Sequence, residues 1–98
     1  MFDKMKGLLE MQKKMQEVKR VLEDTSFDIQ SSDGVVKITM NGSQEVKGIT
    51  LKDNLNEQEK ARLESTLKDT FNRSIKRSQE IAAQKMREVT GINLPGLT

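Results

Sequence analysis

Apolar residues recur at helical spacing in the first quarter of the chain. Leu8, Met11, Met15, Val18 and Leu22 follow one another at intervals of 3, 4, 3 and 4 residues. This spacing places them on one stripe of a helix, as in a heptad repeat. Most positions between them hold Lys, Glu or Gln, which are good helix formers, and no proline interrupts the run. The pattern predicts a helix over residues 3–24 whose apolar stripe packs against a partner helix.

Alternating apolar and polar residues predict three short strands in the middle of the chain. The strands cover residues 26–31, 35–40 and 44–52. Asp33-Gly34 and Asn41-Gly42 lie between them, and both pairs tolerate the positive φ angles of a tight hairpin turn. The alternation of the third strand slips by one position at Gly48, which predicts a β-bulge. The expected sheet is a three-stranded antiparallel meander with one apolar face.

A second, longer helix is expected over residues 57–90. Asn56 and Glu59 are spaced as in a capping box, and Gly91 supplies a C-terminal stop. At 1.5 Å per residue this helix is about 50 Å long, whereas the strands span only about 20–30 Å. The helix must therefore project beyond the sheet, and we expect its distal half to pack with the first helix as an arm. Its stripe consists of Leu63, Leu67, Phe71, Ser74, Ser78, Ala82, Met86 and Val89.

These elements predict an α+β fold class with the order α-β-β-β-α, in a single domain over residues 1–98. The composition limits the core of such a domain, because only 34% of the 98 residues are hydrophobic and 3% are aromatic. A monomer of this size has few side chains to bury. We therefore expect a homodimer, in which a second copy adds core without adding sequence.

The composition also excludes most catalytic chemistry. Cysteine and histidine are absent, which removes disulfides, thiolates, the usual general base and the commonest metal ligand. We expect no enzyme activity, no catalytic or metal-binding residues, no cofactor and no small-molecule substrate. No segment approaches the roughly 20 apolar residues of a membrane span, and the charged N-terminus is unlike a signal peptide. These features favour a cytoplasmic protein without membrane association.

The net charge of +2 hides an uneven distribution. Residues 1–22 carry six basic and three acidic side chains, and residues 60–98 carry eight basic and four acidic ones. Residues 23–59 carry three basic and eight acidic side chains. Two basic helices therefore flank an acidic sheet. Lys and Arg on helix surfaces meet DNA phosphates through charge-assisted contacts, and an acidic sheet would turn the basic arms toward DNA.

Several motifs, in their order and spacing, resemble the YbaB/EbfC family. They are Met11–Gln16 (MQKKMQ), Gly34–Gly42 (GVVKITMNG), Phe71–Ser74 (FNRS) and Leu94–Gly96 (LPG). The resemblance implies an α-β-β-β-α fold that dimerises through its sheet region and leaves helical arms. It also implies binding of duplex DNA, with weak sequence preference, by a nucleoid-associated protein. The family pattern usually has alanine at position 74, where this chain has serine.

On this basis we expect phosphate contacts from basic residues along the arms, namely Lys4, Lys6, Lys13, Lys14, Lys76, Arg77, Lys85 and Arg87. An alternative function is a protein-interaction module for a DNA-repair or translation partner, suggested by Met1, Met5, Met11 and Met15. Core packing is the preferred interpretation for Met11 and Met15, since they share the stripe of Leu8 and Val18. RNA binding through the same basic surface is a third hypothesis.

Overall fold

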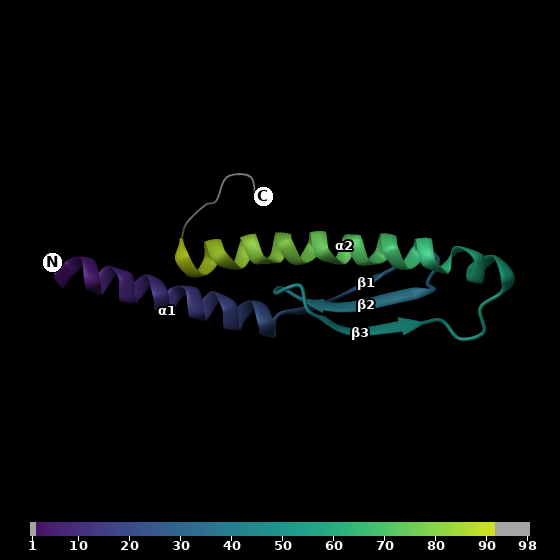
Figure 1. Ribbon diagram of the computed structural model, residues 1–98, viewed down its shortest axis with the longest axis horizontal. Coiled ribbons are helices and arrows are strands. Elements are labelled where there is room, and N and C mark those ends of the chain that lie inside the picture. Colours follow the sequence, from purple (N-terminus) through teal and green to yellow (C-terminus); the bar gives the residue numbers. More distant parts are fainter. Residues whose placement is uncertain (1, 92–98) are drawn as a thin grey trace.

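The computed structural model describes the backbone of residues 2–91 and the side chains from Lys4 to Gly91. Its elements are α1 (Phe2–Asp24), β1 (Ser26–Gln30), β2 (Val36–Asn41), β3 (Val46–Leu51) and α2 (Glu57–Thr90). The strands form one antiparallel sheet in the order β1-β2-β3, and α2 lies along it as a second layer (Figure 1). The α-β-β-β-α fold class is therefore confirmed. The strand bounds differ from the predicted ones by one or two residues.

One face of the sheet carries its apolar side chains. Ile38 of β2 lies opposite Ile29 of β1 and Ile49 of β3. Because side chains alternate between the faces of a sheet, and directly paired residues share a face, these three point to the same side. The same rule adds Phe27, Val36, Met40, Val46 and Leu51 to this face.

The predicted β-bulge is present in β3. Thr39 pairs with Gly48, but the next residue of β2, Met40, pairs with Val46. Lys47 is therefore the extra residue of β3, and it has no direct partner on β2. The insertion restores the apolar side chain of Val46 to the same face as Ile49. It explains why the alternation along this strand slips by one position.

The two turns differ in the residue that adopts a left-handed conformation. In the first turn Gly34 has φ 75°, as the Asp-Gly pair predicts. In the second turn the left-handed residue is Gln44, with φ 61°, and Gly42 is not among the residues with positive φ. The expectation that Asn41-Gly42 forms a tight turn through positive φ is therefore wrong. The Asn41 side chain instead holds a wider turn, because its Oδ1 accepts the backbone N–H groups of Ser43 and Glu45, both at 3.0 Å.

The core lies between α2 and the first two strands. Its members are the buried Val35, Val36 and Ile38, packed against the half-buried Leu55, Leu63 and Leu67. Met40 is also fully buried. The apolar side chains of β3 are left outside this core, since Val46, Ile49 and Leu51 remain 41, 52 and 42% exposed. These three side chains form an exposed apolar strip along β3, which is one of the two edge strands of the sheet.

Both ends of α2 carry the capping residues expected from the sequence. The Asn56 side chain accepts the backbone N–H of Glu59 at 2.8 Å, and the Glu59 side chain accepts that of Asn56 at 3.0 Å. This reciprocal pair is the predicted capping box. At the other end Gly91 is left-handed, with φ 73°, and donates its N–H to the Arg87 carbonyl. The long helix is thus bounded by local chemistry at each end.

Only part of α1 packs against the rest of the molecule. α1 contacts α2 and β2, and its one buried side chain among those described is Val18, which is 3% exposed. The N-terminal half of α1 projects beyond the end of α2 as an arm (Figure 1), so the molecule extends over 68 Å. Leu8, Met11 and Met15 are 71, 46 and 44% exposed. Within one copy of the chain, Met11 and Met15 are therefore not core residues, contrary to the expectation.

Candidate nucleic-acid interface

The turn between β2 and β3 fixes the junction between the arm and the sheet. Gly42 donates its N–H to the carbonyl oxygens of Leu22 and Thr25, both at 3.0 Å. The Asn41 side-chain amide donates to the Glu23 carbonyl at 3.1 Å. A Cβ atom at position 42 would lie 3.2 and 3.3 Å from the backbone O and Cα atoms of Leu22, as well as 2.9 Å from its Cδ2 atom, so this close approach favours glycine. These contacts fix the direction of α1 relative to the sheet.

Ser78 of α2 holds the same turn from the other side. Its hydroxyl donates to the Asn41 carbonyl at 2.9 Å and accepts the Gln44 N–H at 3.1 Å. Ser74, one turn earlier and equally buried, donates only to the Thr70 carbonyl within its own helix. The sequence placed both serines on one stripe as small residues for helix packing. Nothing in their spacing distinguishes the residue that bonds the turn from the one that does not.

The four basic residues predicted on α1 lie on the projecting arm. Lys4, Lys6, Lys13 and Lys14 are all exposed. None of them forms an ion pair with an acidic side chain of the described residues. Their ammonium groups are therefore free to meet an external anion. Lys6 and Lys13 are seven residues apart, which places them on the same face of the helix.

The basic residues predicted on α2 are more engaged. Lys76 is exposed and makes no ion pair with the described residues, whereas Arg77 lies 3.3 Å from Glu80 and Lys85 lies 3.4 Å from Glu88. Both pairs are at i, i+3 spacing, a signal that the sequence already contains. Such exposed pairs are weak, so they reduce rather than abolish the capacity of these side chains to bind phosphate.

Two further arginines are less available to an external ligand. Arg87, the eighth predicted contact, is half-buried near the end of α2. Arg73, three residues before Lys76 on the same helix, donates to the Gln30 carbonyl at 2.7 Å. It thereby ties α2 to the end of β1. Of the four contacts predicted on α2, Lys76 alone is exposed and without an ion pair among the described residues, whereas all four predicted on α1 are.

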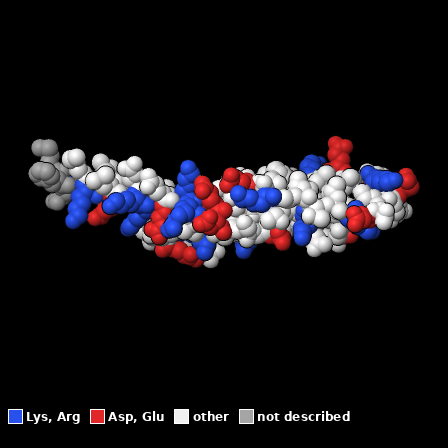
Figure 2. All heavy atoms as spheres, turned by 90° about the horizontal axis from the view of Figure 1, so that it is seen from below, with Lys and Arg blue, Asp and Glu red and all other residues white. Residues whose placement is uncertain are grey.

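Charge is unevenly distributed along the surface. Figure 2 shows Lys and Arg side chains along the projecting arm and Asp and Glu side chains gathered near the middle of the molecule. Glu23 and Asp24, at the end of α1, are both exposed. An approaching polyanion would be repelled at the middle and attracted along the arm. The arm is therefore the part of this face best suited to a nucleic-acid backbone.

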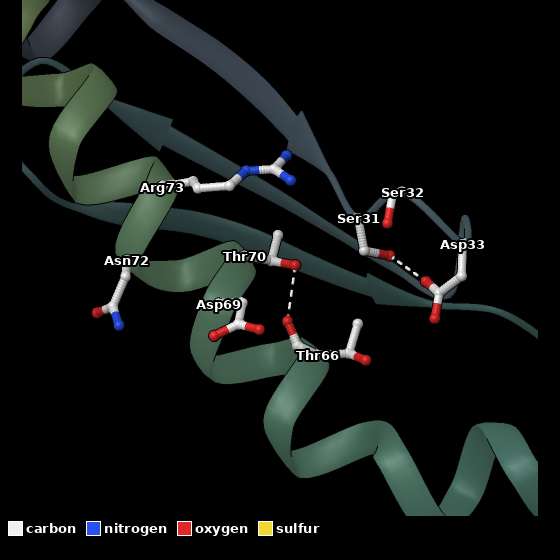
Figure 3. A pocket seen from close by; sticks show the side chains of 8 residues that line it. All are labelled: Ser31, Ser32, Asp33, Thr66, Asp69, Thr70, Asn72 and Arg73. Atoms are coloured by element: carbon white, nitrogen blue, oxygen red, sulfur yellow. Dashed lines mark hydrogen bonds between the residues drawn. The ribbon is translucent and has the colours of Figure 1, made fainter.

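A polar groove lies between the first turn and α2 (Figure 3), at the opposite end of β1 from the arm junction. It encloses about 500 Å³ and is lined by Ser31, Ser32, Asp33, Thr66, Asp69, Thr70, Asn72 and Arg73. Several of these groups already bond within the fold. Ser31 donates to Asp33 at 2.6 Å, and Asp33 also accepts the Val35 N–H at 3.1 Å. These two bonds hold the pKa of Asp33 below its usual value, so Asp33 acts as an acceptor that fixes the turn.

Other candidate chemistry is sparse in the part of the chain that the structure describes. There, no group of three or more His, Cys, Asp or Glu side chains is arranged to hold a metal ion. No helix within residues 2–91 combines the length and hydropathy needed to cross a membrane. Glu59, whose carboxylate accepts from the Lys52 ammonium at 2.7 Å and from the Asn56 N–H, has a lowered pKa for these reasons. Its role is to cap α2.

Comparison with known proteins adds the family to this geometry. The sequence model of the YbaB/EbfC DNA-binding family matches residues 1–92, which is almost the whole chain. The chain belongs to the YbaB/EbfC family. This confirms the resemblance carried by the motifs of the first helix, the second strand and the last helix.

Two further comparisons support the family and the fold, respectively. A nucleoid-associated protein of Flavobacterium johnsoniae is 32% identical over 90 residues, covering 92% of this chain and 84% of that protein. The crystal structure of an uncharacterised protein of Helicobacter pylori has the same fold, with a TM-score of 0.76. It is 24% identical, and the match covers 93% of this chain and 98% of that one. The fold and the family are thus established by independent comparisons.

Proposed function

We propose that this YbaB/EbfC protein binds duplex DNA as a nucleoid-associated homodimer in the cytoplasm, with weak sequence preference and a structural or regulatory role. The family and the nucleoid-associated relative support DNA as the ligand. The observation that carries the proposal for this chain is the set of exposed lysines on α1, which make no ion pair with the described residues. Contacts of this type are with phosphates and carry no sequence information. Weak sequence preference follows from that chemistry.

The proposed phosphate contacts are the eight basic residues selected from the sequence. Within this set the structure favours the α1 lysines and Lys76, because they are exposed and make no ion pair with the described residues, whereas Arg77 and Lys85 have acidic neighbours. Each phosphate contact releases condensed counterions from DNA. The affinity should therefore fall steeply as the salt concentration rises.

Fluorescence anisotropy of a labelled random duplex, measured over a salt series, tests this proposal. Replacing Lys6 and Lys13 with alanine should weaken binding to all duplexes. It should also reduce the slope of log K against log salt by roughly 0.9 for each phosphate that the variant no longer neutralises. The matched control replaces Lys37 of β2 and Lys68 of α2, which are exposed, make no ion pair with the described residues and lie outside the arm. Equal reductions in affinity for both variants would show that the arm is not the binding surface.

We further propose that the homodimer forms through β3. This strand is at the edge of the sheet, so one side of its backbone has no partner strand within the described residues. Its apolar side chains Val46, Ile49 and Leu51 lie on the core face but are not covered by α2. A second copy placed there would bury them and would leave both arms free. The proposed dimer also remedies the shortage of core that the composition indicates.

Two neighbouring substitutions in β3 test the proposed interface. Ile49→Glu places a charge on the exposed apolar strip, whereas Thr50→Glu places the same charge on the opposite face of the same strand. Sedimentation equilibrium should show a monomer for the first variant and a dimer for the second. A dimer that survives Ile49→Glu would place the interface elsewhere.

The alternative function, binding of a protein partner, is supported by one observation. Met5, Leu8, Met11 and Met15 are exposed on α1, and apolar side chains at this spacing are usually covered by another helix. RNA binding has no feature of its own that favours it over DNA. Competition between unlabelled structured RNA and the labelled duplex distinguishes these two nucleic acids.

A further inference from the structure

The stripe of α1 runs continuously from a packed section to an open one. Val18 is buried where α1 and α2 pack together, and Leu22 at the next stripe position is half-buried. Toward the N-terminus the same stripe continues through Met15, Met11 and Leu8, all of which are exposed. Figure 1 shows α1 continuing past the end of α2 at this point. We call Leu8, Met11 and Met15 the open seam.

The spacing of the open seam is that of a surface for another helix. Leu8 and Met15 occupy equivalent positions one heptad apart, and Met11 lies between them at the second seam position. Methionine side chains are flexible and adapt to varied apolar partners. A helix lying end to end with α2 would extend the contact that α2 already makes. The geometry of a bound partner is thus continuous with an existing helix–helix interface.

The charges beside the open seam select the sign of that partner. In a heptad with Leu8 and Met15 at the first position, the flanking positions beside the open seam hold Met5, Gly7, Gln12 and Lys14. Lys19 occupies the next flanking position, beside the buried Val18. Glu10 and Glu17 fall on positions that face away from it. Lys14 and Lys19 are therefore the charged residues at the described flanking positions, and none of these positions holds an acid. A partner with acidic residues beside its apolar stripe would be attracted, whereas a second copy of α1 would bring lysine against lysine.

We infer that the open seam binds an amphipathic helix with acidic flanks, supplied by another protein. This inference rests on the proposed protein-binding alternative and gives the chemistry of the partner. It does not depend on DNA binding, because the lysines used to test DNA contact, Lys6 and Lys13, lie on the other side of α1 from the seam. The two functions can therefore be measured separately on the variant that changes only Met11 and Met15, whereas Lys14 is itself one of the proposed phosphate contacts.

The test uses three labelled synthetic helices of three heptads each. The acidic peptide has leucine at both seam positions and glutamate at both flanking positions. The basic peptide replaces those glutamates with lysine. The scrambled peptide has the composition of the acidic one without its heptad order. Anisotropy titrations of the full chain should give the tightest binding for the acidic peptide, at least tenfold tighter than for either of the others.

Two double variants locate the site. Met11→Ser with Met15→Ser removes the apolar seam without changing charge, and should reduce affinity for the acidic peptide at least tenfold. Lys14→Glu with Lys19→Glu should reverse the preference, so that the basic peptide becomes the tighter ligand. Leu9→Ser is the matched control, because Leu9 is 57% exposed on the same arm but lies outside the heptad stripe. This control should bind the acidic peptide as the unmodified chain does, and circular dichroism should show unchanged helix content in all variants.

Three results would overturn the inference. Equal binding of the scrambled peptide would reduce the effect to simple charge attraction. Self-association of the chain that disappears in the Met11→Ser, Met15→Ser variant would assign the seam to a second copy. Binding to anionic lipid vesicles that Leu9→Ser weakens as much as the seam variant would assign the arm to a lipid surface. Duplex DNA affinity, measured on the seam variant, should stay within about twofold, so failure of peptide binding and failure of the proposed DNA function remain distinguishable.

Discussion

Replacing Ser78 with alanine is expected to weaken the attachment of the β2–β3 turn to α2. The Ser78 hydroxyl is fully buried and makes two hydrogen bonds outside its own helix, to the Asn41 carbonyl and from the Gln44 N–H. Each bond contributes a net stabilisation of about 1 kcal/mol. The Gln44 N–H also reaches the Asn41 carbonyl at 3.2 Å, so neither group loses all of its partners. The expected decrease in the free energy of unfolding is therefore about 1–2 kcal/mol.

Ser74→Ala is the matched comparison for this prediction. Ser74 has the same side chain and the same full burial, one helical turn away. Its hydroxyl bonds only to the Thr70 carbonyl, which the regular helix already pairs with the Ser74 N–H. Alanine also has a helix propensity about 0.5 kcal/mol better than serine. The free energy of unfolding should change by less than about 0.5 kcal/mol.

Urea unfolding followed by circular dichroism measures both variants. All samples are compared at one protein concentration, because association would make the apparent stability depend on it. In thermal unfolding, each kcal/mol corresponds to about 4–8 °C in Tm for a domain of this size. Equal decreases in stability for the two variants would refute the reasoning. They would mean that the turn gains nothing specific from the Ser78 hydroxyl.

Three other predictions concern stability. Gly42→Ala forces a Cβ against Leu22 and should lower the free energy of unfolding by about 1–3 kcal/mol in urea titrations. Gly48→Ala is the comparison, because a Cβ there meets open space and should change the same free energy by no more than about 1 kcal/mol. Asn56→Ala removes the N-cap of α2 and should cost about 1 kcal/mol in the same assay. Because the pKa of Glu59 is lowered in the folded state, its ionised carboxylate stabilises the fold at pH values above the unfolded glutamate pKa of about 4.3. This stabilisation is lost as the pH falls through the lower pKa of the folded state. The stability difference between the unmodified chain and Glu59→Gln should therefore shrink between pH 7 and pH 3 (an unchanged difference would contradict this).

Much of the candidate interface could be predicted from the sequence, but not its accessibility. The eight basic residues were selectable by charge and position alone, and the i, i+3 spacing of Arg77 with Glu80 was visible as well. The bond from Arg73 to the Gln30 carbonyl was not, because these residues are 43 positions apart. Which cations remain free for a phosphate is decided by neighbours of this kind.

The sequence by itself determined the order of the elements, the β-bulge at Gly48, the capping box of α2 and the stop at Gly91. These features follow from local rules, since side-chain periodicity and turn chemistry act over a few residues. Only the tertiary structure decided that Val18 is buried while Met11 and Met15 on the same stripe are exposed. It also decided that Gly42 serves close helix contact rather than a positive φ. The physical reason is that burial depends on where a distant helix ends, and the local pattern of a stripe is the same on either side of that point.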